Sequence, residues 1–303
     1  MNEFALIKKL FTPLSANFPG ALGLTDDAAL ISPPDNMQLV ITTDMLHETI
    51  HFIGNESPAD IARKLVRRNL SDLAAMGAEP YCCFLGLGVP STRGKAWLES
   101  FAEGLTEDLQ KFAFPLSGGD TGNSKTHISL SLTACGLVPT GQALRRNGAQ
   151  IGDDIYVSGT IGDAALGLKI LRGEFPPHSF LKQDDFLKQR YLIPQPRLEL
   201  GKKLREIANS CIDISDGLLQ DLQHICTTSH CSATINYEKI PFSRPLPPEL
   251  KSELISAGDD YELLFTAPTE KSAEILALGE NITCIGKIIV GEFVAPSGYQ
   301  HKF

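Results

Sequence analysis

Aspartate residues recur along this sequence at points where loops are expected to begin or end. They are the pair Asp26-Asp27, the single residues Asp44 and Asp72, Asp120 after Gly118-Gly119, Asp213 with Asp216, and the pair Asp259-Asp260. A turn, a helix cap or a solvated surface explains any one of them alone. If they converge, they repel one another unless cations neutralise them. Carboxylate, hydroxyl and water oxygens are the ligands that Mg²⁺ prefers, so the pattern favours several Mg²⁺ ions and a bound polyphosphate.

The segment Gly119 to Thr126 nearly matches a second phosphate-binding pattern, the P-loop GxxxxGK[ST]. Ser124 stands where the second glycine belongs, and Asp120 would put a negative charge inside the phosphate cradle. We therefore predict that this segment is not a P-loop. The pair Gly118-Gly119 instead predicts a backbone that comes close to a ligand, which Asp120 would meet through a metal ion.

Apolar periodicity predicts the elements that position these aspartates in the first half of the chain. It predicts strands at 39–42, 81–89 and 128–134, and helices from Ser57-Pro58 to about Gly77 and around 97–109. Ser57 is expected to cap the first of these helices, with Pro58 at its first position and Gly77 just beyond its end. Asp44 and Asp120 would then directly follow apolar strands, where α/β folds place ligands.

A polar, turn-rich stretch from Pro139 to Asp154 predicts a domain boundary, which divides the chain into residues 1–138 and 139–303. In the second half, the patterns predict strands at 155–158, 233–237, 262–267 and 282–289, and helices at about 163–171, 197–209 and 216–227. This alternation of strands and helices indicates an α/β or α+β fold with two domains.

The composition excludes several classes of protein. Of 303 residues, 43% are hydrophobic and 21% charged, which is typical of a globular chain and not of a disordered one. The net charge of −9 argues against nucleic acid and anionic membrane surfaces as partners. Apolar runs are too short to span a bilayer, the N-terminus lacks the pattern of a signal peptide, and the seven scattered cysteines lack a CxxC pair. We therefore expect a soluble, cytoplasmic protein without zinc or a disulfide framework.

Six motifs, in order and over nearly the whole chain, resemble those of a known family. They are Gly23–Ala29 (GLTDDAA), Thr42–Asp44 (TTD), Asn69–Ala78 (NLSDLAAMGA), Gly118–Thr121 (GGDT), Ile212–Leu218 (IDISDGL) and Asp259–Leu263 (DDYEL). Together they resemble the thiamine-monophosphate kinase family, within the aminoimidazole-ribonucleotide-synthetase-like superfamily of ATP-binding enzymes. One such motif alone is modest support, whereas the complete series is specific.

The resemblance implies a fold, a reaction and a partner. The fold would be two α/β domains, in which N-terminal strands form a barrel at the interface of a homodimer. Residues 1–138 would bind ATP and Mg²⁺ and dimerise, and residues 139–303 would cover the nucleotide and the thiamine site. The reaction would be Mg²⁺-dependent, direct in-line transfer of the ATP γ-phosphoryl group to thiamine phosphate, the last step of thiamine diphosphate biosynthesis.

The resemblance also implies roles for particular residues. The metal ligands would be Asp27, Thr42, Thr43, Asp44, Asp72, Asp120, Asp213 and Asp216, among which Asp44, Asp72 and Asp120 would act in catalysis through Mg²⁺. ATP would contact Gly119, Asp120, Arg146 and Ser215, and thiamine phosphate would contact His51, Asp259 and Tyr299. Two residues depart from the family pattern: Thr25 replaces a glycine, and Asp259 replaces the usual glutamate.

Other interpretations remain to be weighed against this one. A selenophosphate synthetase would need a reactive cysteine near the N-terminus, and the hydrogenase-maturation relative would carry one at the C-terminus; this chain has neither. Aminoimidazole-ribonucleotide synthetase has different motifs at the positions of the DDAA and NLSDLAAMGA runs. A non-catalytic ATP-binding scaffold would not need the full set of acidic motifs. Singly, His51 is explained as a structural histidine, Arg146 as a solvated residue and Tyr299 as C-terminal packing.

Overall fold

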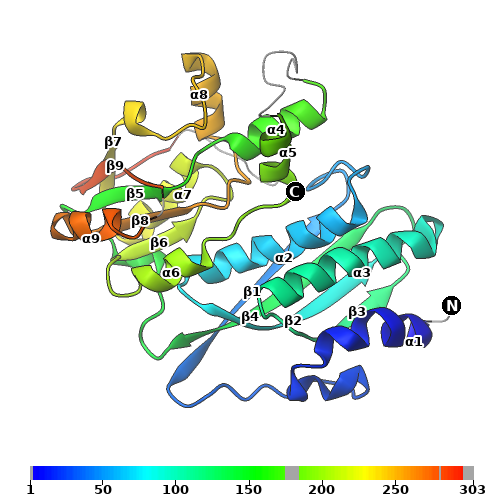
Figure 1. Cartoon of the computed structure of the whole chain (residues 1–303). Coiled ribbons are helices and arrows are strands. Elements are labelled where there is room, and N and C mark those ends of the chain that lie inside the picture. Colours follow the sequence, from blue (N-terminus) through cyan, green and yellow to red (C-terminus); the bar gives the residue numbers. More distant parts are fainter. Residues whose placement is uncertain (1–2, 175–183, 280, 296–303) are drawn as a thin grey trace. The chain divides into compact units, whose positions relative to one another are not determined.

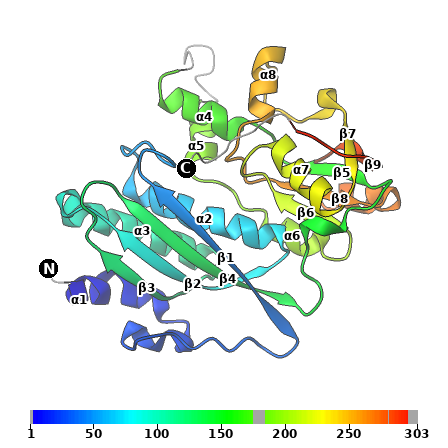
Figure 2. The same ribbon diagram turned by 180° about the vertical axis from the view of Figure 1, so that it is seen from behind.

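The computed structural model describes residues 3–174, 184–279 and 281–295. Contacts divide the chain into two compact units, residues 1–73 with 78–141 and residues 74–77 with 142–303. Figures 1 and 2 show the ribbon from the front and from behind. The division at residues 141 and 142 falls inside the polar stretch 139–154.

The first unit carries its strands and helices in an order that alternates between the two. They are α1 (Glu3–Leu6), β1 (Met37–His47), α2 (Pro58–Ala75), β2 (Glu79–Gly88), α3 (Gly94–Lys111), β3 (Leu116–Gly122) and β4 (Ser129–Pro139). Short π and 3₁₀ turns fill much of the segment from Ile7 to Leu24. The predicted helix from Pro58 is confirmed, and Gly77 ends it with a positive φ of 65° while its N–H donates to the carbonyl of Ala74.

The sheet of the first unit has the strand order β1-β4-β2-β3 among the described residues. β4 pairs antiparallel with both β1 and β2, whereas β3 runs parallel to β2. The parallel pair is joined through α3, as a crossover connection requires. The sheet is open in the single chain, so the predicted barrel at a dimer interface stays a prediction.

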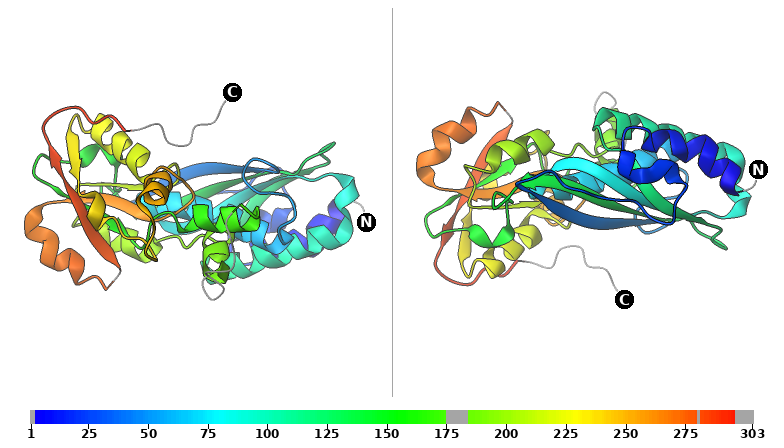
Figure 3. Two further views of the ribbon diagram at one scale, coloured as in Figure 1. Left: turned by 90° about the horizontal axis from the view of Figure 1, so that it is seen from above. Right: turned by 90° about the horizontal axis from the view of Figure 1, so that it is seen from below.

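α2 and α3 lie side by side on one face of this sheet, where Figure 1 labels them and Figure 3 shows the same layers from above and below. Between helices and strands lies an apolar core that includes Leu65, Leu70, Phe101, Leu85 and Leu132, each at most 4% exposed. Burial of such side chains stabilises the layer by roughly 1.5–3 kcal/mol each.

Two features hold α2 and α3 close together. Arg67 of α2 makes a two-pronged ion pair with Asp108 of α3, with Nε–Oδ2 and Nη2–Oδ1 distances of 2.6 and 2.8 Å. Nearby, Gly104 of α3 faces the carbonyl oxygen of Ala59 so closely that a Cβ at position 104 would lie 2.2 Å from it. The helix spacing therefore requires glycine at that position.

The second unit contains the remaining elements. They are β5 (Asp154–Ser158), α4 (Asp163–Leu171), α5 (Asp184–Leu192), α6 (Leu198–Leu204), β6 (Ser210–Asp213), α7 (Leu218–Thr228), β7 (Ser232–Ile235), α8 (Pro248–Ile255), β8 (Leu263–Ala267), α9 (Ser272–Leu276) and β9 (Ile282–Ile289). Among the described residues its sheet has the order β6-β8-β5-β9-β7, and every neighbouring pair is antiparallel.

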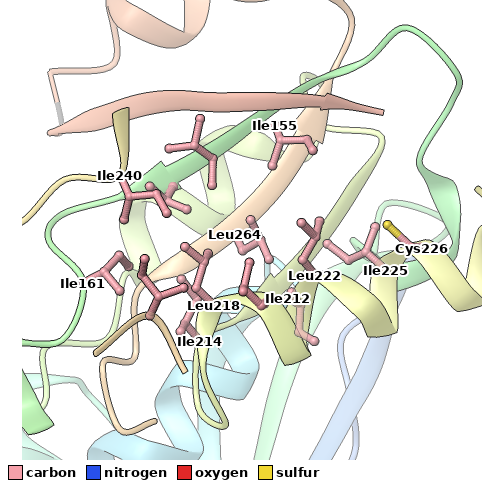
Figure 4. Close-up of a cluster of buried hydrophobic side chains, with 14 of the residues drawn as sticks. Ile155, Ile161, Ile212, Ile214, Leu218, Leu222, Ile225, Cys226, Ile240 and Leu264 are labelled. Carbon is pink, nitrogen blue, oxygen red and sulfur yellow. The ribbon is translucent and has the colours of Figure 1, made fainter. Parts of the chain in front are cut away.

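The core of the second unit lies between this sheet and α7 (Figure 4). Ile155 and Leu264 of the strands meet Leu218, Leu222 and Ile225 of α7, and all five are at most 2% exposed. The spacing of the three α7 residues by three or four positions puts them on one helix face. In the described part of the chain, no helix has the length and apolar character needed to cross a membrane.

Candidate functional site

A cavity of about 440 Å³ in the first unit brings together two of the predicted acidic motifs. Asp26 and Asp27 line it from the loop after the segment Pro19–Leu24, and Gly119 and Asp120 line it from β3. Phe84 and several other apolar side chains form the rest of its wall. The carboxylates come from two separate segments, so the cavity combines an acidic lining with an apolar wall.

β3 sets the position of Asp120 by pairing with β2. Asp120 stands opposite Gly86 in the parallel register, and Gly119 stands opposite Leu85. A Cβ on Gly119 would lie 2.1 Å from the carbonyl oxygen of Leu85, so this glycine permits a close approach of two strands. The neighbouring strand therefore requires glycine at position 119, which also lines the cavity, and the close approach of Gly118-Gly119 to a ligand stays a prediction.

The structure bears out the prediction that this segment is not a P-loop. A P-loop leads from a strand through a glycine-rich turn into a helix. Here β3 continues to Gly122, and after a short turn the chain enters another strand, β4. Lys125 thus lies in a turn between strands and not at the start of a helix.

Asp44 and Asp120 do not follow strands, as the sequence suggested, but lie within them. β1 continues for three residues beyond Asp44, to His47, and β3 for two beyond Asp120, to Gly122. β1 extends past Asp44 because Met45 and Leu46, which are apolar, continue the backbone pairing with β4. The side chains of both aspartates therefore stand on faces of the sheet and not at its end.

A second acidic group forms between β1 and α2. The Thr42 hydroxyl donates to Oδ2 of Asp72 at 2.5 Å, and the backbone N–H of Asp44 donates to Oδ1 of Asn69 at 3.1 Å. Arg68 lies with its Nε 3.5 Å from Oδ2 of Asp44, so a positive charge already faces this carboxylate. Thr42, Asp44 and Asp72 are thus brought together as the sequence suggested.

Thr43 lies apart from this second group. Successive residues of a strand point to opposite faces, so Thr42 and Asp44 face the helices while Thr43 faces the other side. The Thr43 hydroxyl shares a hydrogen bond of 2.8 Å with that of Thr133 on β4. The pairing register across β4 and β2 places Asp120 on the same face as Thr43. In one chain, the proposed ligands of the first unit are therefore divided between two faces of the sheet.

The acidic residues of the second unit gather around the start of α7. Asp213 ends β6 and is 2% exposed. Asp216 follows, and its carboxylate lies within 4.8 Å of ligand atoms of Asp221 and His224. Oδ2 of Asp221 accepts the backbone N–H groups of Ser215 and Asp216, at 3.1 and 3.2 Å. Burial, together with the charge of Asp216, raises the pKa of Asp221 to about 7.

Sequence reasoning missed Asp221 and His224. Asp221 and His224 are three residues apart on a helix, which puts both on one side of α7, and this spacing was a signal that could have been used.

Arg146, a proposed ATP contact, lies in a short 3₁₀ turn, and its backbone carbonyl accepts a hydrogen bond from the Ser229 hydroxyl at 3.1 Å. The positive charge of Arg146 lowers the pKa of Asp221, but burial has the larger effect and raises it.

His51 lies in a turn that follows β1, and its ring accepts a backbone hydrogen bond within that turn. Nδ1 of His51 accepts the backbone N–H of His47 at 3.0 Å, so the neutral ring carries its proton on Nε2. The turn is anchored by the buried Glu48, which accepts the backbone N–H of Ile128 at 2.9 Å and pairs with Arg93. His51 is therefore arranged to donate a hydrogen bond from Nε2.

Asp259 belongs to a loop that contacts the segment of Ser215. The backbone N–H of Asp259 donates to the carbonyl of Ser215 at 2.9 Å, and Oδ1 accepts the Tyr261 hydroxyl at 2.9 Å. Asp259 and Ser215, predicted for thiamine phosphate and for ATP, are thus brought together within the second unit. Tyr299, the remaining predicted substrate residue, lies outside the described residues.

Comparisons with known proteins match both halves of the chain. Residues 25–138 match the family described as AIR synthase related protein, N-terminal domain, and residues 150–298 match its C-terminal domain. The thiamine-monophosphate kinase of Haemophilus influenzae is 43% identical over 95% of this chain and 89% of its own. The Escherichia coli K12 enzyme of the same name is 43% identical over 94% and 90%. The chain belongs to the thiamine-monophosphate kinase family.

Solved structures agree with the family assignment. The crystal structure of thiamine-monophosphate kinase from Stenotrophomonas maltophilia K279a has a TM-score of 0.86 and 40% identity, covering 96% of this chain and 95% of its own. AaThiL complexed with AMPPCP and TMP has a TM-score of 0.80 and 30% identity, covering 99% and 97%. The predicted two-domain fold of the superfamily is therefore confirmed for this member of the thiamine-monophosphate kinase family.

Proposed function

We propose that this chain phosphorylates thiamine phosphate with ATP, giving thiamine diphosphate and ADP as the last step of thiamine diphosphate biosynthesis. The observation that carries the proposal is the cavity in which Asp26, Asp27 and Asp120 lie together, in a chain 43% identical to named thiamine-monophosphate kinases. The complex of AaThiL with AMPPCP and TMP supports the same pair of substrates. A cytoplasmic location stays a prediction.

The reaction needs binding and orientation more than covalent help. An oxygen of the acceptor phosphate attacks the γ-phosphorus of ATP, the bond from this phosphorus to the β–γ bridging oxygen breaks, and ADP leaves. We propose that Gly119, Asp120, Arg146 and Ser215 bind ATP. His51, Asp259 and Tyr299 would hold thiamine phosphate. When both substrates are bound with the acceptor oxygen in line with the bond that breaks, the entropic cost of bringing them together has already been met by binding, which lowers the activation barrier.

The donor atoms of the first unit fit Mg²⁺. The cavity presents the carboxylates of Asp26, Asp27 and Asp120, and within the described residues its lining contains neither histidine nor cysteine. Hard cations prefer such oxygen ligands. We propose that Asp27, Thr42, Thr43, Asp44, Asp72, Asp120, Asp213 and Asp216 hold Mg²⁺. Bound Mg²⁺ would neutralise the negative charge of the two anionic reactants.

Measuring ADP release with and without thiamine phosphate tests the proposed function. We expect release that depends on thiamine phosphate and yields one thiamine diphosphate for each ADP. ADP release at the same rate with and without thiamine phosphate would favour an ATPase or a relative with another acceptor. We further expect no phosphorylated protein in rapid-quench experiments with labelled ATP, because direct transfer forms no aspartyl phosphate. A trapped phosphoprotein that turns over at the rate of catalysis would refute direct transfer.

The His51→Asn variant should raise the KM for thiamine phosphate about tenfold and leave the melting temperature unchanged. The amide oxygen of asparagine can replace Nδ1 as acceptor for the N–H of His47, so the turn is retained. Asparagine does not extend to the position of Nε2, and the lost hydrogen bond to an anionic phosphate corresponds to about tenfold in affinity. Steady-state kinetics with thiamine phosphate as the varied substrate provide the measurement. An unchanged KM would remove His51 from the substrate site.

The protein should form a homodimer of roughly twice 32.9 kDa. On the sheet face away from α2 and α3, Ile41 and Met45 of β1 are 60% and 45% exposed, beside the hydroxyls of Thr43 and Thr133. Such apolar side chains on an open sheet face favour burial against a second copy. Light scattering at micromolar concentration measures the mass. The double variant Ile41→Asp, Met45→Asp should weaken association, and a wild-type monomer would contradict the proposal.

A further inference from the structure

The loop of residues 259–262 has an unusual backbone. Asp259 and Tyr261 both have positive φ angles, 69° and 52°, although neither is glycine. Residues with a Cβ avoid this left-handed region, so surrounding contacts must hold the loop in place. Backbone strain of this kind concentrates at functional sites, and the contacts of the loop indicate which side chain it positions.

The backbone of the loop is fixed on both sides by the second unit. The N–H of Asp259 donates to the carbonyl of Ser215 at 2.9 Å, and the N–H of Tyr261 donates to that of Ile214 at 2.8 Å. The fully buried Asp260 accepts the N–H of Gly162 at 2.8 Å. Backbone groups and the Asp260 carboxylate therefore hold the loop in its conformation.

Glu262 anchors the far end of the loop. It is fully buried, and its carboxylate accepts hydrogen bonds from Arg190 at 2.8 Å, from Arg197 at 2.6 Å and from the Ser158 hydroxyl at 2.5 Å. Charge-assisted hydrogen bonds of this kind are among the stronger ones in proteins. The residue that follows Tyr261 is thus rigidly attached to the second unit.

The Tyr261 side chain connects this rigid frame to Asp259. Tyr261 is 1% exposed, and its hydroxyl donates to Oδ1 of the partly exposed Asp259 at 2.9 Å. A buried phenol can change its position little, so the donor stays fixed and restricts rotation of the Asp259 carboxylate. The side chain of aspartate is short, which makes its direction depend strongly on such a contact.

We propose that Tyr261 is a positioning residue that orients the Asp259 carboxylate toward the thiamine moiety of the substrate. The inference rests on the proposed function, because it assigns Asp259 to the thiamine-phosphate site. The thiamine moiety carries a cationic ring and an amino group, both of which a correctly directed carboxylate attracts. Tyr261 acts through Asp259 and does not touch the reacting phosphates.

The Tyr261→Phe variant isolates the hydroxyl, because phenylalanine keeps the buried ring. We expect the KM for thiamine phosphate to rise about five- to twentyfold, near the lower end of the effect of losing one hydrogen bond to a charged group, because the hydroxyl acts through Asp259. The kcat and the KM for ATP should stay within about twofold of wild type, which a general disturbance of the fold would not allow. A loss of the folded state, or an equal change for both substrates, would overturn the proposal.

A double-mutant cycle with Asp259→Ala provides the decisive control. We expect Asp259→Ala to raise the KM for thiamine phosphate, and Tyr261→Phe to add nothing in that background. Additive effects, or an Asp259→Ala variant with wild-type KM, would overturn the role of Tyr261. These outcomes can be distinguished from a failure of the proposed function, because in that case the wild-type protein itself would show no ADP release that depends on thiamine phosphate.

Discussion

Replacing Asp72 or Asp44 by asparagine is expected to lower kcat by about a hundred- to a thousandfold while the fold is retained. Each change removes a negative oxygen from the proposed Mg²⁺ ligands, and the loss of one group that stabilises developing charge typically costs a hundred- to a thousandfold in kcat. Asparagine at position 72 can still accept the hydroxyl of Thr42, so the contact between β1 and α2 survives.

A matched variant on the same helix controls for an effect on the fold. Asp60 of α2 pairs with Arg63 at 2.6 Å and has no place among the proposed ligands, so Asp60→Asn should keep near wild-type kcat. The measurements are ADP release at saturating Mg²⁺ and the melting temperature of all three variants. If Asp72→Asn or Asp44→Asn kept its activity at saturating Mg²⁺, that residue would not belong to the site.

Mg²⁺ with ATP should stabilise the protein strongly, and so should Mg²⁺ with a non-hydrolysable ATP analogue. Asp26, Asp27 and Asp120 concentrate negative charge in one cavity, and a bound cation removes their repulsion. At a hundredfold excess over Kd, ligand binding adds about 2.7 kcal/mol to the free energy of unfolding. For a chain of this size the melting temperature should rise by roughly 4–8 °C.

A measurement with ATP and EDTA distinguishes Mg²⁺-dependent binding of ATP from binding in a P-loop, which would not need the cation to hold the phosphates. Without divalent cations the acidic cavity repels the triphosphate, so the melting temperature should hardly change. Asp120→Asn should show a smaller shift with Mg²⁺ and ATP than wild type, whereas Asp60→Asn should show the full shift. A large shift with ATP in EDTA would indicate that lysine and backbone amides hold the phosphates, as they do in a P-loop.

Strong local signals allowed several elements to be predicted with accurate ends. Ser57, Pro58 and Gly77 bracket α2, and the predicted bounds of α4 and β9 match those observed. The strand expected before Asp120 was given no bounds, and β3 extends beyond this residue although three of its seven residues are glycines, which disfavour strands by themselves. Its extended form depends on pairing with β2, which is distant in the sequence and therefore invisible to local patterns.

The candidate site was predictable as a set of motifs but not as an arrangement. The contact of Thr42 with Asp72 agrees with their proposed common role. The consecutive residues Thr42, Thr43 and Asp44 suggested one group of ligands, because the strand was expected to end there. β1 instead continues, and its alternation turns Thr43 to the opposite face. The contact between Asp259 and Tyr261 depends on a strained loop conformation that no periodicity reveals.

The close contact between Gly104 of α3 and Ala59 of α2 limits which amino-acid replacements the protein tolerates at position 104. Any amino-acid replacement of Gly104 adds a Cβ that would lie 2.2 Å from the carbonyl oxygen of Ala59, so α3 would have to move away from α2. Because Arg67 and Asp108 tie the same two helices, the displacement would reach the part of α2 that carries Asp72. Replacing the neighbouring Glu103, whose side chain is exposed, should leave the spacing of the two helices unchanged.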